Sequence, residues 1–107
     1  MKFIDPQDLI EQEAAEQRET EAKQLSRQVE IDDFKSLMDG KAGRRFVWRL
    51  LDKAGVFRAT DRTDALSMAF REGTRNFGLM LLTEINETCP EKYNLMVKEQ
   101  QDAQSGN

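Results

Sequence analysis

Two glycines, Gly73 and Gly78, enclose a basic and polar tetrapeptide in "GTRNFG", a spacing that phosphate-binding loops also have. Such a loop needs a lysine and a serine or threonine directly after the second glycine, to reach the phosphates and Mg²⁺. Leu79 and Met80 stand there instead, and the preceding "DALSMAFREG" is rich in helix formers. We therefore predict a helix over this stretch and no nucleotide cofactor.

The arginines offer the other candidate chemistry, because a guanidinium stays charged and presents forked donors to carboxylates or phosphates. Arg45, Arg49 and Lys53 recur at intervals of four, which places them along one side of a helix. Three interpretations remain open: a solvated charged face, a phosphate-binding surface, or a surface that docks on an acidic patch of a partner protein. The candidate binding residues are Arg44, Arg45, Arg49, Arg58, Arg62, Arg71 and Arg75.

The sequence pI near 4.9 argues against a dedicated nucleic-acid binder, which more often has a strongly basic domain. Trp48 lies among the arginines. One aromatic ring makes no platform for stacked bases, so we expect Trp48 to lie in the core or to anchor an interface.

Catalytic chemistry has little support in the residue types present. The chain has no histidine, and Cys89 is its one cysteine. These counts exclude zinc fingers, disulfides within the chain and Cys/His nucleophilic pairs. Neither Asp32-Asp33 nor Asp61 with Asp64 resembles a calcium loop or has an evident partner base. We therefore expect a protein that is not an enzyme and that binds no metal or cofactor.

Length and composition bound the architecture. A chain of 107 residues with 38% hydrophobic residues fits one modest domain, and no apolar run is long enough to cross a membrane. The first residues lack the apolar run of a signal peptide, so we expect a cytoplasm-like compartment and no membrane partner. Charge is uneven: the net charge is −6 over residues 1–40, +5 over 41–75 and −3 over 76–107.

The residue pattern predicts an all-α fold, a small helical bundle with a long polar N-terminal helical arm. Residues 1–30 form the acidic arm, in which ten of the 22 residues from Gln7 to Gln28 are Glu or Gln. Residues 31–99 form the compact helical domain, and residues 100–107 form a disordered tail. Asp5 and Pro6 mark the start of the arm helix.

The arm carries a weak heptad seam that leaves two interpretations open. Its apolar positions are interrupted by Arg18 and are partly filled by alanine, so the helix has little to bury. It is either a solvated helix or a helix that packs on a partner subunit. The seam consists of Ala15, Arg18, Ala22, Leu25 and Val29.

Helix boundaries in the compact domain follow from turn and cap residues. A short amphipathic stretch ends at Asp39-Gly40, and a helix over 44–54 ends at Gly55. Asp61 or Thr63 caps a long helix that ends before Cys89-Pro90, and Pro90 starts the last helix.

The long helix is predicted to present one broad apolar face to the core. Within that face, Ala69 and Gly73 lie one turn apart, and together they form a notch where another helix approaches. The face consists of Leu66, Phe70, Gly73, Phe77, Met80, Leu81 and Ile85.

Three stretches, "GRRFVWRLLDKAGVFR", "FREGTRNFGLMLLTEI" and "CPEKYNLM", resemble a family of small proteins encoded among the structural genes of short-tailed double-stranded-DNA phages. The resemblance runs from about Phe34 to Glu99 and leaves the arm outside. It implies a structural or assembly role in the virion, or in the host cytoplasm during assembly. It carries over no catalytic residues.

Three functional hypotheses stay under consideration. The leading hypothesis is a virion or morphogenesis protein that docks on the portal, on neighbouring head or tail components, or on an internal core, with several copies around a symmetric assembly. The alternatives are a module that binds DNA through the basic centre, in packaging or regulation, and a small inhibitor of a host enzyme.

Overall fold

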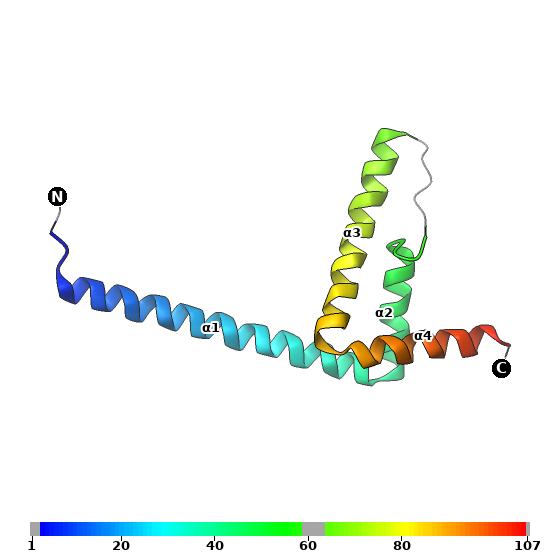
Figure 1. Cartoon of the computed structure of the whole chain (residues 1–107), viewed down its shortest axis with the longest axis horizontal. Coiled ribbons are helices and arrows are strands. Elements are labelled where there is room, and N and C mark those ends of the chain that lie inside the picture. Colours follow the sequence, from blue (N-terminus) through cyan, green and yellow to red (C-terminus); the bar gives the residue numbers. More distant parts are fainter. Residues whose placement is uncertain (1–2, 59–63, 107) are drawn as a thin grey trace. The chain divides into compact units, whose positions relative to one another are not determined.

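The structure, a computed structural model, describes residues 3–58 and 64–106, and these residues form four α-helices and no strand (Figure 1). The all-α prediction is confirmed. The helices are α1 (Pro6–Asp39), α2 (Lys41–Lys53), α3 (Ala65–Thr88) and α4 (Pro90–Gln104).

The chain divides into two compact units, Met1–Asp33 and Phe34–Asn107. The division falls inside α1, because no helix-breaking residue occurs before Asp39-Gly40. In the first unit, Asp5 accepts a hydrogen bond from the backbone N–H of Gln7 at 3.0 Å, as a capping residue does. Leu25 and Val29 of the weak heptad seam are 69% and 58% exposed, so nothing in the described chain covers that seam.

The end of α2 is fixed by Gly55, as predicted. Its φ of +79° lies in the left-handed region, which glycine adopts without a steric cost. Gly55 N–H then donates to the carbonyl of Asp52 at 3.0 Å, and Val56 N–H donates to that of Leu51 at 3.2 Å. These two bonds form a Schellman motif, which satisfies carbonyls that a helix end otherwise leaves open.

The two other helix junctions also depend on local residues. Asp64 caps α3, because its carboxylate accepts from the backbone N–H of Ser67 at 2.8 Å. The predicted caps, Asp61 and Thr63, lie outside the described residues. Cys89 separates α3 from α4, and Pro90 opens α4, as predicted.

α4 continues to Gln104, five residues beyond the predicted end of the compact domain at residue 99. The polar sequence of residues 100–104 led us to predict a tail there. These residues nevertheless include the good helix former Gln, and they extend a helix already nucleated at Pro90.

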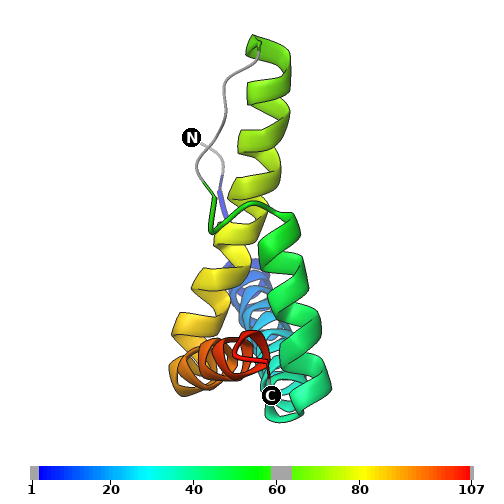
Figure 2. The ribbon, with the colours of Figure 1, turned by 90° about the vertical axis from the view of Figure 1, so that its right-hand side faces the viewer.

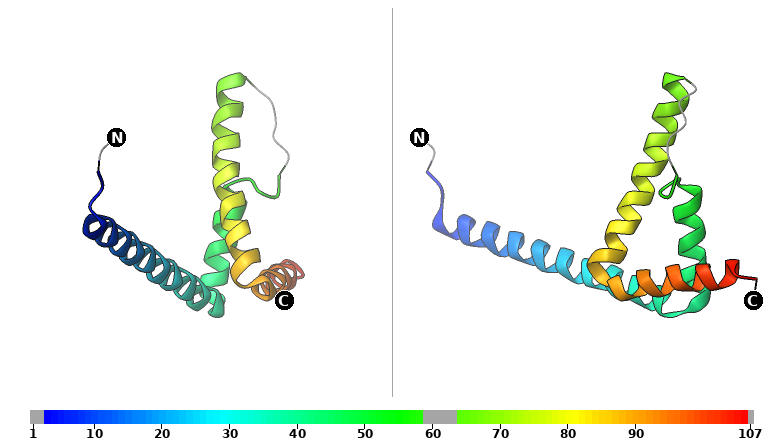
Figure 3. Two further views of the ribbon diagram at one scale, coloured as in Figure 1. Left: turned by 60° about the vertical axis from the view of Figure 1, so that its left-hand side comes forward. Right: turned by 45° about the vertical axis from the view of Figure 1, so that its right-hand side comes forward.

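The core of the second unit lies where α2, α3 and α4 pack against one another, and the last turns of α1 add to it (Figure 3). Half-buried side chains surround it, among them Phe34, Trp48 and Tyr93. The fully buried set is small, which is usual for so short a chain. Its members are Met38, Val47, Leu51, Ile85, Cys89 and Met96.

α3 does not present a single apolar face to the core, and this part of the prediction is wrong. Ile85 and Gly78 are buried, whereas Phe70 and Phe77 are 78% and 67% exposed. Phe70 is exposed because α3 is longer than α2: 24 residues of α3 extend about 36 Å and 13 residues of α2 about 20 Å. Phe77 is next to the buried Gly78 but lies on another side of the helix. Figure 2 shows the first turns of α3 continuing past the end of α2.

The close approach between helices occurs at Gly78 and not at the predicted notch of Ala69 and Gly73. A Cβ added to Gly78 would lie 2.5 Å from Val56 Cγ2 and 2.6 Å from Ala54 Cβ. A Cβ added to Gly73 would meet no atom of the described chain within 4 Å, and Ala69 is exposed. No residue of the described chain packs against Gly73, which lies beyond the end of α2 and, five residues from Gly78, on another side of α3.

Two alanine substitutions in the same helix should therefore change stability in opposite directions. Gly73→Ala should raise the free energy of unfolding by up to about 1 kcal/mol, since alanine is the better helix former and the site is open. Gly78→Ala should lower it by about 1–2 kcal/mol, because overpacking against Ala54 and Val56 exceeds that gain. Urea unfolding at low protein concentration measures both. Equal effects at the two glycines would contradict the packing described.

Candidate interaction surface

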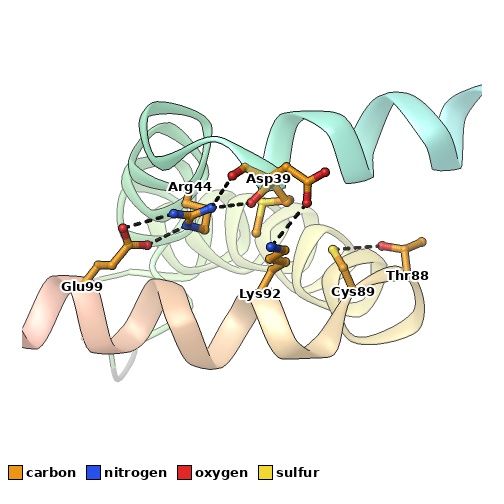
Figure 4. A network of polar contacts seen from close by, with 7 residues as sticks. Asp39, Arg44, Thr88, Cys89, Lys92 and Glu99 are labelled. Atoms are coloured by element: carbon orange, nitrogen blue, oxygen red, sulfur yellow. Dashed lines mark hydrogen bonds and ion pairs between the residues drawn. The ribbon is translucent and has the colours of Figure 1, made fainter.

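Arg44 is a charged residue on the buried face of α2. Val47 and Leu51 follow it three and seven residues later, so all three side chains point to the same side of the helix. Arg44 is 7% exposed. Its Nε donates to Glu99 Oε1 at 2.6 Å and its Nη2 to Glu99 Oε2 at 3.3 Å, a forked ion pair that joins α2 to α4 (Figure 4).

The third nitrogen of the Arg44 guanidinium reaches the end of α1. Nη1 donates to the backbone carbonyls of Met38 at 2.9 Å and Asp39 at 2.8 Å. These carbonyls belong to the last turn of α1, where the helix itself supplies no N–H groups to bond them. The Asp39 carboxylate in turn pairs with Lys92 Nζ of α4 at 3.3 Å (Figure 4). The end of α1, α2 and α4 are thus connected through one polar network.

The ion pair shifts both ionisation equilibria toward the charged forms. The hydrogen bond from Arg44 lowers the pKa of the Glu99 carboxyl, although burial opposes the shift. The same bond raises the pKa of the Arg44 guanidinium. Stabilisation from Glu99 is therefore complete above the usual pKa of a glutamate, and it is lost as the pH falls through the lowered value.

Arg44 is consequently not part of an exposed binding surface, which corrects its place among the candidate binding residues. All three of its nitrogens donate within the chain. One hint of this was visible in the spacing, since Arg44 shares the apolar side of α2 with Val47 and Leu51. Its partner Glu99 lies 55 residues away along the chain, and no local pattern pointed to it.

The opposite side of α2 is exposed and has a mixed cationic and apolar composition. Arg45 and Arg49 are both exposed there, one turn apart. Phe46 is 49% exposed and Leu50 38% exposed, although both residue types usually avoid water. We call this set the α2 outer face, and its members are Arg45, Phe46, Arg49, Leu50 and Lys53.

The other predicted arginines lie elsewhere. Arg58 is exposed beyond the end of α2 and pairs with Asp52 at 3.2 Å. Arg62 lies outside the described residues. Arg71 and Arg75 are on α3, where Arg71 is exposed and Arg75 is half-buried. The Nε of Arg75 is buried and has no hydrogen-bond partner among the described residues. The structure therefore divides the predicted basic centre among separate elements instead of forming one surface.

Trp48 is engaged within the chain. Its ring stacks on Phe57 with 4.7 Å between ring centroids and an angle of 24° between the planes. It also packs against the core. The sequence left two places open for Trp48, the core and an interface. In the structure Trp48 lies at the edge of the core. The face of its ring that stacks on Phe57 is not available to a partner.

A hollow of about 220 Å³ lies between α2 and α4 next to Arg45. Small-molecule sites usually have roughly 300–1,000 Å³ and a mainly apolar lining. This hollow is smaller and mostly lined by charged and polar side chains, so its geometry suits contact with a partner side chain better than an enclosed ligand. The lining residues are Lys41, Arg45, Glu99, Gln100, Asp102 and Ala103.

In the part of the chain that the structure describes, no three side chains of the metal-binding types are grouped as a metal ion requires. No described helix combines the length and the apolar character needed to cross a membrane.

Comparison with known proteins places the second unit in a family. The family model described as Bbp19-like phage protein matches residues 34–98, which is more than half of the chain. The match begins at Phe34, the residue at which the second unit begins. No curated protein and no solved structure matches the chain. The predicted resemblance to a family of small phage proteins is thus confirmed, and the protein is phage-associated.

Replacing Glu99 with Gln tests the buried ion pair through its pH dependence. At neutral pH the substitution should lower the free energy of unfolding by about 2 kcal/mol, because a charged hydrogen-bond acceptor becomes neutral. The difference from the unsubstituted protein should shrink below pH 4.5, as Glu99 itself becomes protonated. Urea unfolding at several pH values measures this.

The control is Glu87→Gln, which neutralises an exposed carboxylate on α3. It should change the free energy of unfolding by less than about 0.5 kcal/mol at any of these pH values. If the two variants behave alike, the Arg44–Glu99 pair does not stabilise the fold.

Proposed function

The chain belongs to the Bbp19-like phage protein family, and we propose that it is a non-enzymatic virion or morphogenesis protein that docks on a larger phage assembly through the α2 outer face. The partner is a neighbouring phage structural protein, such as the portal or a head–tail component, that presents an acidic surface. The protein then resides in the virion, and in the host cell during assembly.

The observation that carries this proposal is the composition of the α2 outer face. Arginine and aromatic residues are enriched in protein interfaces, where the arginine fork binds carboxylates and the ring fills an apolar pocket. Arg45 and Arg49 flank Phe46 on successive turns, and all three are exposed. A face that served solubility alone would not need Phe46 and Leu50 in water.

The inner side of the same helix supports the proposal by keeping the outer side in place. Arg44, Val47 and Leu51 are buried, and Arg44 is bonded to two other elements. The α2 backbone is therefore held before any partner arrives. A partner that binds a fixed surface loses less conformational entropy than one that must first order it.

The charge on the face favours an acidic partner. Arg45 and Arg49 keep their charge at any physiological pH, and Lys53 extends their row by one more turn. Such a row steers an acidic surface into register and penalises a basic one.

DNA is the second candidate, because the same row could neutralise backbone phosphates. The exposed apolar side chains of Phe46 and Leu50 fit a protein partner better, because backbone phosphates have no apolar surface on which these side chains could pack. The formal net charge of −4 also opposes association with a polyanion.

Replacing both arginines tests the docking proposal. Arg45→Gln with Arg49→Gln should keep the helix, because Gln is nearly as good a helix former, and should reduce incorporation into phage particles by about tenfold. Mass spectrometry of purified particles from phage that carry the double substitution measures the amount of protein incorporated.

The matched control removes two positive charges elsewhere on the second unit, at the exposed Lys35 and Lys98, by substitution with Gln. This control should be incorporated at the unsubstituted level. Incorporation of the double arginine variant at that same level would contradict docking through the α2 outer face. Retention on DNA that falls steeply from low to moderate salt, and that the arginine variant loses, would support the DNA alternative instead.

A further inference from the structure

α3 carries a row of large apolar side chains that nothing in the described chain covers. Leu66 is 82% exposed, Phe70 78%, Phe77 67% and Met80 69%. Gly73 lies in the same row, and its Cα faces open space. Single exposed apolar residues are ordinary, but a contiguous set of this size usually marks an interface. We call these five residues the α3 stripe.

The spacing of the α3 stripe is that of a helix-packing seam. From Leu66 the residues follow at intervals of four, three, four and three, the pattern that places side chains along one line facing a second helix. The rest of α3 shows what a covered seam looks like, since Gly78 and Ile85 are buried against α2 and α4. The α3 stripe is thus a second packing seam, and no helix of the described chain packs against it.

The positions that flank the α3 stripe are small or neutral. They carry no charge, so two copies of the stripe could meet without like-charge repulsion, and their size permits a close approach of two backbones. The flanking residues are Ser67, Ala69, Thr74, Asn76 and Thr83.

We propose that the occupant of the α3 stripe is the α3 stripe of a second copy, packed antiparallel to form a two-fold symmetric dimer. With the two-fold axis midway between Phe70 and Gly73, Phe70 of each copy lies over Gly73 of the other, and Leu66 lies over Phe77. The contacts are then the same in both copies, as a self-complementary interface requires.

Size complementarity selects the antiparallel orientation. Phe70 lies three residues before Gly73, and Phe77 lies four residues after it. In this antiparallel register, the Phe70 ring of each copy fills the space that the missing side chain of Gly73 leaves in the other. A parallel pair would set Gly73 against Gly73 and leave a void, which is unfavourable in a packed interface.

The area available is sufficient for a weak specific dimer. An aromatic side chain buries roughly 150–250 Å² when fully covered. Four large side chains that each contribute about 100–150 Å² give about 400–600 Å² per copy, or roughly 800–1,200 Å² in total, close to the lower limit of specific interfaces. The α3 stripe shares no residue with the α2 outer face, so dimerisation and docking are independent.

Sedimentation velocity of the full chain over a range of concentrations tests the dimer. The unsubstituted protein should be a dimer at about 100 µM, where even interfaces of modest affinity associate. Phe77→Glu should raise the dissociation constant by about thirtyfold or more, as expected for an interface hot spot. Asn86→Glu, which adds the same charge to an exposed position of α3 away from the stripe, should leave the dimer intact.

The substitution Gly73→Leu distinguishes this specific packing from non-specific apolar association. The leucine side chain has open space in the monomer, so the helix content and the unfolding of the dilute protein should not suffer. In the dimer it would occupy the place of a phenylalanine ring, so the dissociation constant should rise by about tenfold or more. Unchanged or tighter association of Gly73→Leu would overturn the proposed packing.

Salt distinguishes apolar association from pairing of opposite charges between copies. The dimer should persist between low and high salt, since the α3 stripe carries no charged residue. Dissociation at high salt would overturn the proposal, and so would a monomeric unsubstituted protein at about 100 µM. The variant with Gln at positions 45 and 49 should still dimerise, so a failed docking test leaves the dimer test unaffected.

Discussion

The guanidinium of Arg44 is the interaction on which the compact unit depends. Four hydrogen bonds from one side chain connect α2 with Glu99 of α4 and with the last carbonyls of α1. Removing a charge from water is costly, and the complete set of partners offsets that cost. A unit with so few fully buried apolar residues has little other means of holding the last turn of α1 against α2 and α4.

Both exposed surfaces follow from the way this core is built. α2 has 13 residues, and its inner side is occupied by Arg44, Val47 and Leu51, so the remaining arginines can only lie on the outer side. α3 is much longer than α2, and its first turns pass beyond the core (Figure 2). The surplus length carries Leu66 and Phe70, which stay exposed because no helix of the described chain reaches them.

Local features of this fold could be predicted from the sequence, and its long-range contacts could not. Gly55 and Pro90 set helix ends through their own backbone properties, which act within a few residues. Arg44 and Arg45 carry the same charge, but only Arg44 forms the buried ion pair with Glu99. That partner lies 55 residues away along the chain, beyond the reach of any local pattern. Gly73 and Gly78 also look alike in sequence, and which of them is covered depends on the side of α3 that faces α2 and on the length of α2.

We propose that the α2 outer face, which is exposed in this fold, becomes covered in a phage assembly. Hydroxyl-radical footprinting of the dilute free chain and of purified phage particles can test this proposal, with the buried Met96 as an internal reference. Phe46 and Leu50 should be oxidised in the free chain and protected in particles, while Met96 stays protected in both. Equal oxidation of Phe46 and Leu50 in the two samples, or absence of the chain from particles, would contradict it.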